Sequence, residues 1–276
     1  MTQRIAFQGE LGAYSHEACI SARPDAEPVP CASFEAAIEA VQTGAADFAM
    51  LPVENSTYGR VADNHRLLPD CGLYIVDEAF VRVRIALMAN KGVTLSNVKS
   101  VRAHPVLLPQ SSEFLKAHGI AAISAADSAG AAAELVESGS KSEGVLASEL
   151  AANIYGLEVL ASDIEDHGHN TTRFLIMGRE PNYERRGTLG MMTTFVFEVR
   201  NIPAALYKAM GGFATNGVNM TKLESYMVDG NFTATRFYSD IDGHPDDDNV
   251  RLAMAELDYF TSYVKILGTY PADRER

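Results

Sequence analysis

Short apolar strands that alternate with helical stretches constrain the fold of this chain more than any other feature of its sequence. Apolar runs typical of buried strands occupy residues 4–8, 48–53, 98–102, 120–123, 145–147 and 159–161. Helical patterns lie between them, over residues 13–22, 34–43, 107–118, 128–138 and 148–154. This alternation is typical of α/β layers built on a mainly parallel sheet. Ser33 is the predicted N-cap of the helix over residues 34–43.

Two segments mark where the chain divides. Residues 78–88 (EAFVRVRIALM) alternate in part and predict a strand or hairpin partner that leaves the first group of elements. Residues 181–190 are polar, with two arginines and two glycines, and predict a linker. We therefore expect a separate domain after residue 190.

Beyond the linker the pattern becomes strand, helix, two strands, helix and strand. Pro203 and Pro245 stand at the predicted helix starts, where a missing N–H costs little, and Asp229-Gly230 is a hairpin signal. The order βαββαβ is that of a ferredoxin-like unit. The expected elements are strand 193–199, helix 203–215, strand 219–227, turn 228–231, strand 232–241, helix 245–260 and strand 264–270.

The chain is acidic. Its net charge is −13, from 23 Lys and Arg against 36 Asp and Glu among 276 residues. Such a chain offers no electrostatic footprint for nucleic acid or for an anionic membrane. An anionic substrate would need local cations or hydrogen-bond donors, because the overall field repels it.

The cysteines and the first residues bear on the location of the protein. Cys19, Cys31 and Cys71 form no C-x-x-C pair, so we expect free thiols in a reducing compartment rather than disulfides or a zinc site. The opening residues MTQRIAFQGE lack the pattern of a signal peptide, and no apolar run reaches the roughly 18 residues of a membrane span. We therefore expect a cytoplasmic protein.

Three polar or glycine-rich stretches adjoin apolar strands. The first is GELGAYS at residues 9–15, where glycines between a strand and a helix would let backbone N–H groups face an anion. The second is PVENSTYG at residues 52–59, at the carboxyl end of a predicted strand. The third is HGHNTTRF at residues 167–174, just before another apolar run. Open α/β sheets tend to bind ligands at the carboxyl ends of their strands.

Each stretch also has a plain structural interpretation, as a tight turn or a solvated loop. His167 and His169 are spaced like metal ligands, but no further Cys, His or carboxylate cluster stands near them at a ligand spacing, so we expect no metal. The sequence has no G-x-S-x-G elbow and no P-loop. Any chemistry would run on hydroxyls, amides and oriented dipoles.

Taken together, the three stretches resemble the prephenate dehydratase family. The segments that carry the resemblance are IAFQGELGAYSHEA, LPVENSTYG and NTTRFLIMG, in the family's order. The later segment GGFATNGVNMTKLES resembles the effector-binding part of an ACT regulatory domain. The resemblance therefore covers nearly the whole chain.

The resemblance implies an α/β fold with a two-lobed catalytic region like a type II periplasmic binding protein, followed by a ferredoxin-like βαββαβ ACT domain. The catalytic region would span residues 1–182, with lobe 1 at about 1–75 and 156–182 and lobe 2 at about 76–155. The ACT domain would span residues 190–276. The active site would be the cleft between the lobes, a usual place for a small-molecule site.

The resemblance also implies a carbon–oxygen lyase that converts prephenate to phenylpyruvate, water and carbon dioxide in L-phenylalanine biosynthesis. No cofactor and no metal would be needed. L-phenylalanine would act as a feedback inhibitor through the ACT domain, and the protein would form a homodimer or homotetramer. The alternatives are an arogenate dehydratase, which performs the same elimination on the aminated side chain, and a non-catalytic small-molecule binding or sensor protein.

Roles carry over residue by residue from the resemblance. Thr172 would be the central hydroxyl that assists loss of the substrate hydroxyl, and Arg173 would pair with a substrate carboxylate or hold the site together. Glu54 would have a structural hydrogen-bonding role. The other residues expected to bind substrate or position Thr172 are Asn55, Ser56, Thr57, Tyr14, Ser15, Gln110, Asn170 and Phe174.

The chain departs from the family in both regions. Where the family often has Ser-His-Pro-Gln, this chain has Ala103-His104-Pro105-Val106, which leaves the second-lobe wall open to question. In the ACT region Ala204 stands in the familiar Gly-Ala-Leu, and Tyr226 and Met227 replace Arg-Pro after Glu-Ser, so the strength of phenylalanine binding is open. The matching effector residues are Leu206, Asn219, Met220, Thr221, Glu224 and Ser225.

Overall fold

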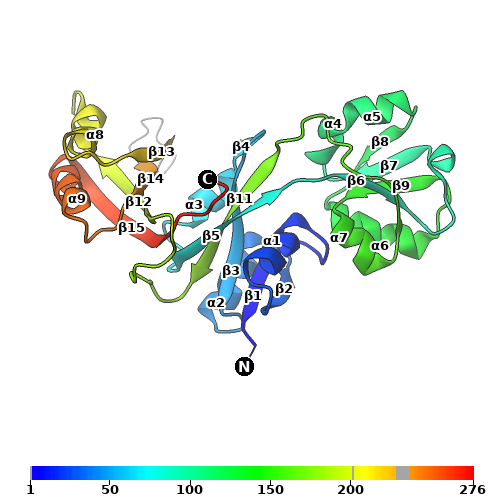
Figure 1. The fold of residues 1–276 in the computed structure, drawn as a ribbon, viewed down its shortest axis with the longest axis horizontal. Helices are drawn as coiled ribbons and strands as arrows, with labels where there is room; N and C mark the ends of the chain where they lie inside the picture. Colours follow the sequence, from blue (N-terminus) through cyan, green and yellow to red (C-terminus); the bar gives the residue numbers. More distant parts are fainter. Residues whose placement is uncertain (1, 201, 228–235) are drawn as a thin grey trace. The chain divides into compact units, whose positions relative to one another are not determined.

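The chain folds into two compact units. The structure, a computed structural model, describes residues 2–200, 202–227 and 236–276. The first unit comprises residues 1–61 and 79–174, and the second comprises residues 62–78 and 175–276 (Figure 1). Strands β5 (Tyr74–Arg82) and β11 (Thr171–Gly178) run from one unit into the other along the chain. The mixed α/β class predicted from the sequence is confirmed.

The first unit has two lobes, and lobe 1 begins the chain. Its strands pair in the order β2-β1-β3, with β1 parallel to both neighbours. Ser33 accepts a hydrogen bond from the Ala36 N–H at 3.1 Å, which confirms the predicted cap. The elements are β1 (Arg4–Gln8), α1 (Tyr14–Ala22), β2 (Glu27–Cys31), α2 (Phe34–Gln42), β3 (Phe48–Asn55) and β4 (Gly59–Arg60).

Strand β2 was absent from the sequence-based prediction. It contains Pro28 and Pro30, which lack the N–H that a central strand must donate. The strand β2 is the last strand of its sheet, so its outer edge has no neighbouring strand in the sheet to which it must donate hydrogen bonds. Prolines are tolerated at such an edge, which explains why the pattern was misleading.

Lobe 2 is a five-stranded sheet in the order β10-β6-β9-β7-β8. Strand β7 is parallel to β8 and β9, whereas β6 is antiparallel to β9 and β10, so this sheet is mixed rather than mainly parallel. Its elements are β6 (Ala86–Ala89), η1 (Leu95–Asn97), β7 (Ser100–Ala103), α4 (Leu107–Gln110), α5 (Ser112–Ala117), β8 (Ala121–Ser124), α6 (Ser128–Ser138), β9 (Glu143–Ala147), α7 (Glu149–Tyr155) and β10 (Glu158–Ala161).

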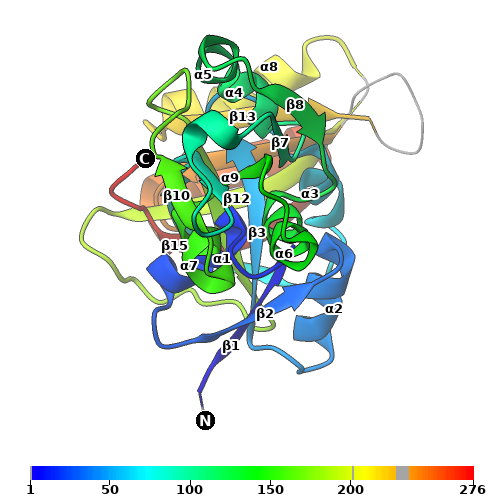
Figure 2. The ribbon, with the colours of Figure 1, turned by 90° about the vertical axis from the view of Figure 1, so that its right-hand side faces the viewer.

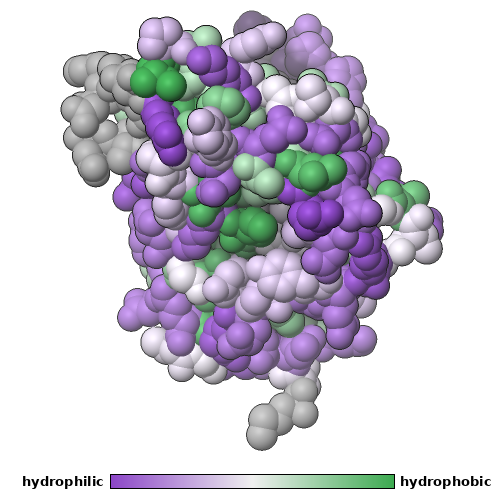
Figure 3. Space-filling view, turned by 90° about the vertical axis from the view of Figure 1, so that its left-hand side faces the viewer, coloured by the Kyte–Doolittle hydropathy of each residue, from purple (hydrophilic) through white to green (hydrophobic). Residues whose placement is uncertain are grey.

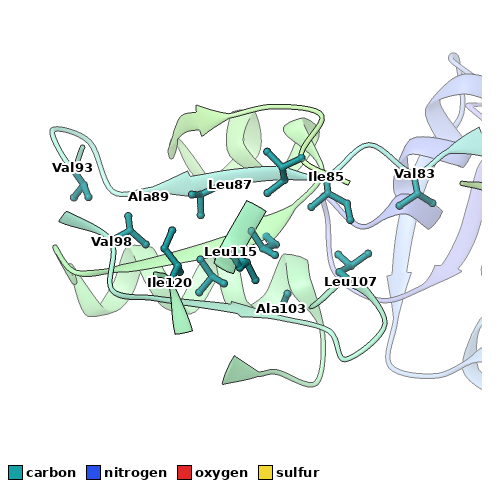
Figure 4. Packing of buried hydrophobic residues seen from close by; sticks show 13 residues of the cluster. Val83, Ile85, Leu87, Ala89, Val93, Val98, Ala103, Leu107, Leu115 and Ile120 are labelled. Atoms are coloured by element: carbon teal, nitrogen blue, oxygen red, sulfur yellow. The ribbon is translucent and has the colours of Figure 1, made fainter. Parts of the chain in front are cut away.

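Helices cover both faces of the lobe 2 sheet, as Figures 1 and 2 show. Along β6, Leu87 and Ala89 belong to the core beneath α4 and α5, which also contains Leu107 and Leu115 (Figure 4). The alternate β6 residues, Ala86 and Met88, belong to the core beneath α6 and α7. Because successive strand residues point to opposite faces, a fully apolar strand is what a sheet between two helical layers requires.

The helix predicted over residues 107–118 is wrong as a single element. It is split at Ser111 into α4 and α5. The Asp166 carboxylate accepts hydrogen bonds from the Ser112 and Glu113 N–H groups, at 3.1 and 3.2 Å, and so caps a new helix start. This capping residue is remote in sequence, so local periodicity could not reveal it.

The strand predicted over residues 78–88 is also two elements, β5 and β6. Residues 83–85 between them cross from lobe 1 to lobe 2 beside the returning segment, residues 162–170. The Val83 N–H donates to the Asn170 carbonyl at 2.8 Å, and the Ile85 N–H donates to a Glu165 carboxylate oxygen at 3.0 Å. The chain therefore crosses between the two lobes twice, through residues 83–85 and 162–170.

In the second unit the predicted order βαββαβ is confirmed. The sheet order is β13-β14-β12-β15, with all three pairs antiparallel. The helices begin later than predicted, so Pro203 and Pro245 precede their first turns, and the predicted turn 228–231 and first part of strand 232–241 lie outside the described residues. The elements are α3 (Ala62–Leu67), β12 (Met191–Val199), α8 (Ala205–Thr215), β13 (Met220–Tyr226), β14 (Arg236–Asp242), α9 (Asp248–Phe260) and β15 (Thr261–Pro271).

Helices α8 and α9 cover one face of this sheet. Phe195, Phe213 and Phe237 lie in the apolar core between helices and sheet. Tyr207 and Tyr259 are 80% and 72% exposed. Figure 3 shows hydrophobic side chains scattered over a largely hydrophilic face on this side of the molecule. Among the described helices, none has the length and apolar character to cross a membrane.

Candidate active site

A pocket of about 370 Å³ in the first unit is lined by residues of both lobes. All three polar stretches singled out in the sequence contribute to it. The predicted site residues among its lining are Tyr14, Ser15, Asn55, Gln110, Asn170, Thr172 and Phe174. Glu54, Ser56, Thr57 and Arg173 are not among the lining residues.

Asn55, at the end of β3, is the centre of a hydrogen-bond network. Its Oδ1 accepts from the N–H groups of Thr57 and Tyr58, at 3.0 and 2.9 Å. Its Nδ2 donates to Asn170 Oδ1 at 2.6 Å and to Thr172 Oγ1 at 3.0 Å. A flipped amide would place donors against both N–H groups, so the network fixes the orientation of Asn55.

The hydrogen bond from Asn55 determines whether the Thr172 hydroxyl acts as a donor or an acceptor toward the pocket. One lone pair of Thr172 Oγ1 receives the Asn55 N–H, and the hydroxyl proton can be directed elsewhere. Thr172 lines the pocket, so a ligand there can receive that proton. The arrangement presents a polarised hydroxyl donor to the cavity.

Gln110 continues the network into lobe 2. Its Oε1 accepts from Asn170 Nδ2, and its Nε2 donates to the Val106 carbonyl at 2.8 Å. The chain of contacts therefore runs from Thr172 through Asn55 and Asn170 to Gln110. Asn170 is 2% exposed, so its bonds are shielded from water.

Arg173 and Glu54 form an ion pair beside the pocket. Arg173 Nη1 lies 2.8 Å from Glu54 Oε2, and the Arg173 side chain is 5% exposed. A buried guanidinium needs such a partner, because removing its charge from water is costly. The pair joins β3 to β11 beside Asn55 and Thr172, which are the chain neighbours of Glu54 and Arg173.

Ser56 holds the loop after β3. Its Oγ donates to the His169 carbonyl at 3.0 Å and accepts from the Thr171 N–H at 2.9 Å. The Ser56 N–H donates to the Thr171 carbonyl at 2.9 Å. These bonds join the second and third polar stretches, although 115 residues separate Ser56 from Thr171.

The first polar stretch supplies the opposite wall. Tyr14 donates its hydroxyl to the Arg84 carbonyl at 2.8 Å and packs against the lobe 2 core. Burial, with the charges of Glu17 and Glu165, raises the pKa of Tyr14, so it remains a neutral donor. Gly9 and Gly12 also line the pocket, as their position after β1 predicts.

Arg60 was missed by the sequence analysis. It carries the one Arg or Lys side chain among the described residues that line the pocket. It directly follows the PVENSTYG stretch, so extending that stretch by one residue would have included it. The carboxylate of the lining is Asp127, which accepts from the Ala129 and Gly130 N–H groups at the start of α6.

Of the two departures in lobe 2, Val106 lines the pocket, whereas Ala103 is buried in the lobe 2 core and is not among the lining residues. Val106 and Leu107 line the pocket beside His104. His104 Nδ1 accepts from the Val106 N–H at 3.3 Å, so the neutral ring carries its hydrogen on the other nitrogen. Among the described residues, no group of three or more His, Cys, Asp or Glu side chains could hold a metal ion.

The expected effector residues lie on or next to α8 and β13 in the second unit. Leu206 and Met220 pack against its apolar core, and Asn219 Nδ2 donates to Asp242 Oδ2 at 2.8 Å. Ala204 has φ +60°, the left-handed conformation that glycine adopts most easily. Thr221, Glu224 and Ser225 lie on β13.

The chain is similar to known proteins over nearly its whole length. A family model described as prephenate dehydratase matches residues 5–182. A bifunctional N-acyl-homoserine lactone acylase/prephenate dehydratase of Komagataeibacter europaeus is 47% identical over 97% of this chain and 95% of its own. An arogenate dehydratase/prephenate dehydratase of Arabidopsis thaliana is 40% identical over 99% of this chain and 73% of its own. A crystal structure of prephenate dehydratase from Arthrobacter aurescens in complex with L-Phe has a TM-score of 0.90 and 30% identity, covering 99% of this chain and 91% of its own.

Glu17 on α1 gives a pH-dependent prediction. Burial, then the charge of Glu149, raises the pKa of Glu17 to about 7, against the attraction of Arg84. A carboxyl with a raised pKa is protonated more readily in the folded state, so its ionisation lowers stability as pH rises from about 4.5 to about 7. Glu17→Gln should therefore raise the thermal midpoint at pH 8 and leave it unchanged near pH 4. An equal effect at both pH values would contradict the assignment.

Proposed function

Because this chain belongs to the prephenate dehydratase family, a family of lyases, we propose that it converts prephenate to phenylpyruvate, water and carbon dioxide in the pocket of the first unit. The observation that carries the proposal is the Thr172 hydroxyl, which accepts from Asn55 and faces the pocket. Loss of carbon dioxide and of the ring hydroxyl makes the ring aromatic, and this drives the reaction. The difficult step is departure of hydroxide, a poor leaving group.

Thr172 assists that departure by donating its proton toward the leaving oxygen. The Asn55 N–H stabilises the charge that develops on Thr172 Oγ1 as this happens. Phe174 and Leu107 give the pocket apolar surface for the ring. Less polar surroundings favour loss of the ring carboxylate's charge as carbon dioxide.

The remaining predicted site residues support these groups. Arg173 and Glu54 act as a structural pair that holds β11 against β3. Ser56 and the Thr57 N–H fix the loop that carries Asn55. Tyr14, Ser15, Asn170 and Gln110 bind or enclose the substrate from the other sides of the pocket. In this account residues 1–182 form the catalytic region and residues 190–276 the regulatory domain.

Thr172→Ala tests the central role. Removing one well-placed transition-state donor costs about 10²–10³ in rate, so turnover of prephenate should fall by that factor with the thermal midpoint unchanged. Thr172→Ser, which keeps the hydroxyl, is the matched control and should retain most of the rate. Near-normal turnover by purified Thr172→Ala would remove Thr172 from the mechanism.

The positive charge of Arg60 is expected to affect the preference of the pocket for prephenate over arogenate. Prephenate carries two carboxylates, whereas in arogenate an ammonium group offsets one of them. A cation at the pocket edge therefore attracts prephenate more strongly. This supports prephenate, although relatives such as the Arabidopsis thaliana protein carry both substrates in their names.

Arg60→Gln should lower kcat/KM for prephenate about tenfold at low salt, about 1.4 kcal/mol, and lower it less for arogenate. The difference should shrink at high salt, because exposed charges are screened. Arg60→Lys is the control that keeps the charge. Equal losses for both substrates, independent of salt, would show that Arg60 does not select by charge.

Residues 190–276 of the second unit are proposed as an ACT domain that binds L-phenylalanine and mediates a homodimer or homotetramer. Support comes from its βαββαβ order and from the Arthrobacter aurescens structure in complex with L-Phe. We also propose a cytoplasmic location, because the three cysteines form no disulfide.

Added L-phenylalanine should therefore suppress prephenate turnover, and the suppression should be saturable. Glu224→Ala on β13 should weaken it while leaving the rate without effector unchanged. Turnover that ignores phenylalanine at every concentration would reduce the domain to an assembly role.

A second candidate function is hydrolysis of an N-acyl-homoserine lactone, the activity in the name of the Komagataeibacter europaeus relative. The apolar wall at Val106 and Leu107 would suit an acyl chain. His104 is a poor general base here, because its Nδ1 already accepts from the Val106 N–H. Release of homoserine lactone by the purified chain, lost in Thr172→Ala, would place both reactions in one pocket.

A further inference from the structure

Helix α7 of lobe 2 holds the glycine loop of lobe 1, defined here as residues 9–13. Ser148 Oγ donates to the Gly12 carbonyl at 2.6 Å, and the Tyr155 hydroxyl donates to the Leu11 carbonyl at 2.9 Å. Two consecutive carbonyls of the loop are thus bound by the N-cap residue of α7, Ser148, and by its last residue, Tyr155. The residues of each pair are 136 and 144 positions apart in the chain.

Gly12 is held from its other side as well. Its N–H donates to His16 Nδ1 at 3.0 Å, and His16 stacks on Phe7 with ring centroids 5.5 Å apart. Its φ is +95°, and a Cβ added there would lie 2.7 Å from the Ala151 Cα. Only glycine allows α7 to approach the loop this closely.

The glycine loop is a wall of the pocket. Gly9, Gly12 and Ala13 line the cavity, and so does Ser148, which is hydrogen-bonded to Gly12. Tyr14, the next residue, is tied to the Arg84 carbonyl on a crossing segment. A shift of the loop away from α7 would therefore widen the space in which a ligand must fit.

We propose that Ser148 and Tyr155 of α7, together with His16 of α1, are positioning residues that fix the glycine loop against lobe 2 and so set the width of the substrate pocket. Tyr155 and His16 act through the loop backbone and are not among the lining residues. The inference rests on the proposed function only for the identity of the substrate.

His16 can accept from Gly12 only while its Nδ1 carries no proton. Burial lowers the pKa of His16, so the neutral ring is favoured in the folded state. The contact is therefore present at neutral pH, persists as pH falls past the ordinary histidine pKa of about 6.5, and is lost only as pH falls through the lowered pKa of His16. The titratable groups on the loop, on α1 and on the elements around it are Glu10, Tyr14, Glu17 and Cys19, Arg4 of β1, Glu27 and Cys31 of β2, Glu54 of β3, and Glu149 and Tyr155 of α7.

Tyr155→Phe is the leading test, because it removes one hydroxyl and keeps the ring. Ser148→Ala is less clean, because Ser148 also caps α7 by accepting from the Ala151 N–H at 3.2 Å. Ile154→Ala, an exposed change on the same helix, is the matched control. Two quantities are measured in the full chain: hydrogen exchange of the amides of residues 9–13 without substrate, and KM and kcat for prephenate.

Tyr155→Phe should speed exchange in the glycine loop and raise KM, each by about 2–12-fold, with a smaller change in kcat. Ile154→Ala should change neither. Unchanged exchange in Tyr155→Phe would overturn the proposal, and so would faster exchange with KM unchanged. If the unaltered chain turns over no prephenate, the proposed function fails while the exchange measurement still decides whether α7 holds the loop.

A pH series tests His16. As pH falls through the lowered pKa of His16, at a pH below about 6.5, the KM of the unaltered chain should rise, and in His16→Asn, whose amide oxygen can replace Nδ1, this rise should be absent. Glu17 titrates nearby, with a pKa of about 7, so Glu17→Gln is compared and should keep the rise. A rise retained in His16→Asn and lost in Glu17→Gln would assign the effect to Glu17 and remove His16 from the proposal.

Discussion

The side-chain amide of Asn55 is the interaction on which the site depends. Its oxygen is held by two N–H groups of its own loop, so its nitrogen must face Asn170 and Thr172. This fixes a donor on the Thr172 oxygen and leaves the Thr172 proton for the pocket. Because the Thr172 hydroxyl is already oriented, little free energy is spent on reorganising it when charge develops on the leaving oxygen. An enzyme without a metal or an activated nucleophile would rely on orientation of this kind.

The two-lobed fold places this amide. Asn55 ends β3, Thr172 lies near the start of β11, and the buried Arg173–Glu54 pair joins the two strands behind the pocket. Gln110 then extends the network into lobe 2. The crossing segments and α7 supply the other contacts between the lobes, so alignment of the lobes and orientation of the Thr172 hydroxyl are linked through neighbouring bonds.

Local sequence patterns predicted the site residues that stand at the ends of strands. Asn55, Thr172 and Gly12 stand beside strand ends, and strand ends of an α/β sheet converge at one edge. Contacts between segments that are distant in the chain could not be predicted from these local patterns. The Asp166 cap that starts α5 is remote from that helix, and the edge position of β2, which tolerates Pro28 and Pro30, depends on strand order.

The measurement that tests the central claim most directly is turnover of prephenate by the purified chain, followed as phenylpyruvate, beside the same assay with arogenate. The account predicts that phenylpyruvate forms from prephenate with an equal amount of carbon dioxide, and faster than product forms from arogenate. Well-folded protein that releases product from neither authentic substrate would contradict it.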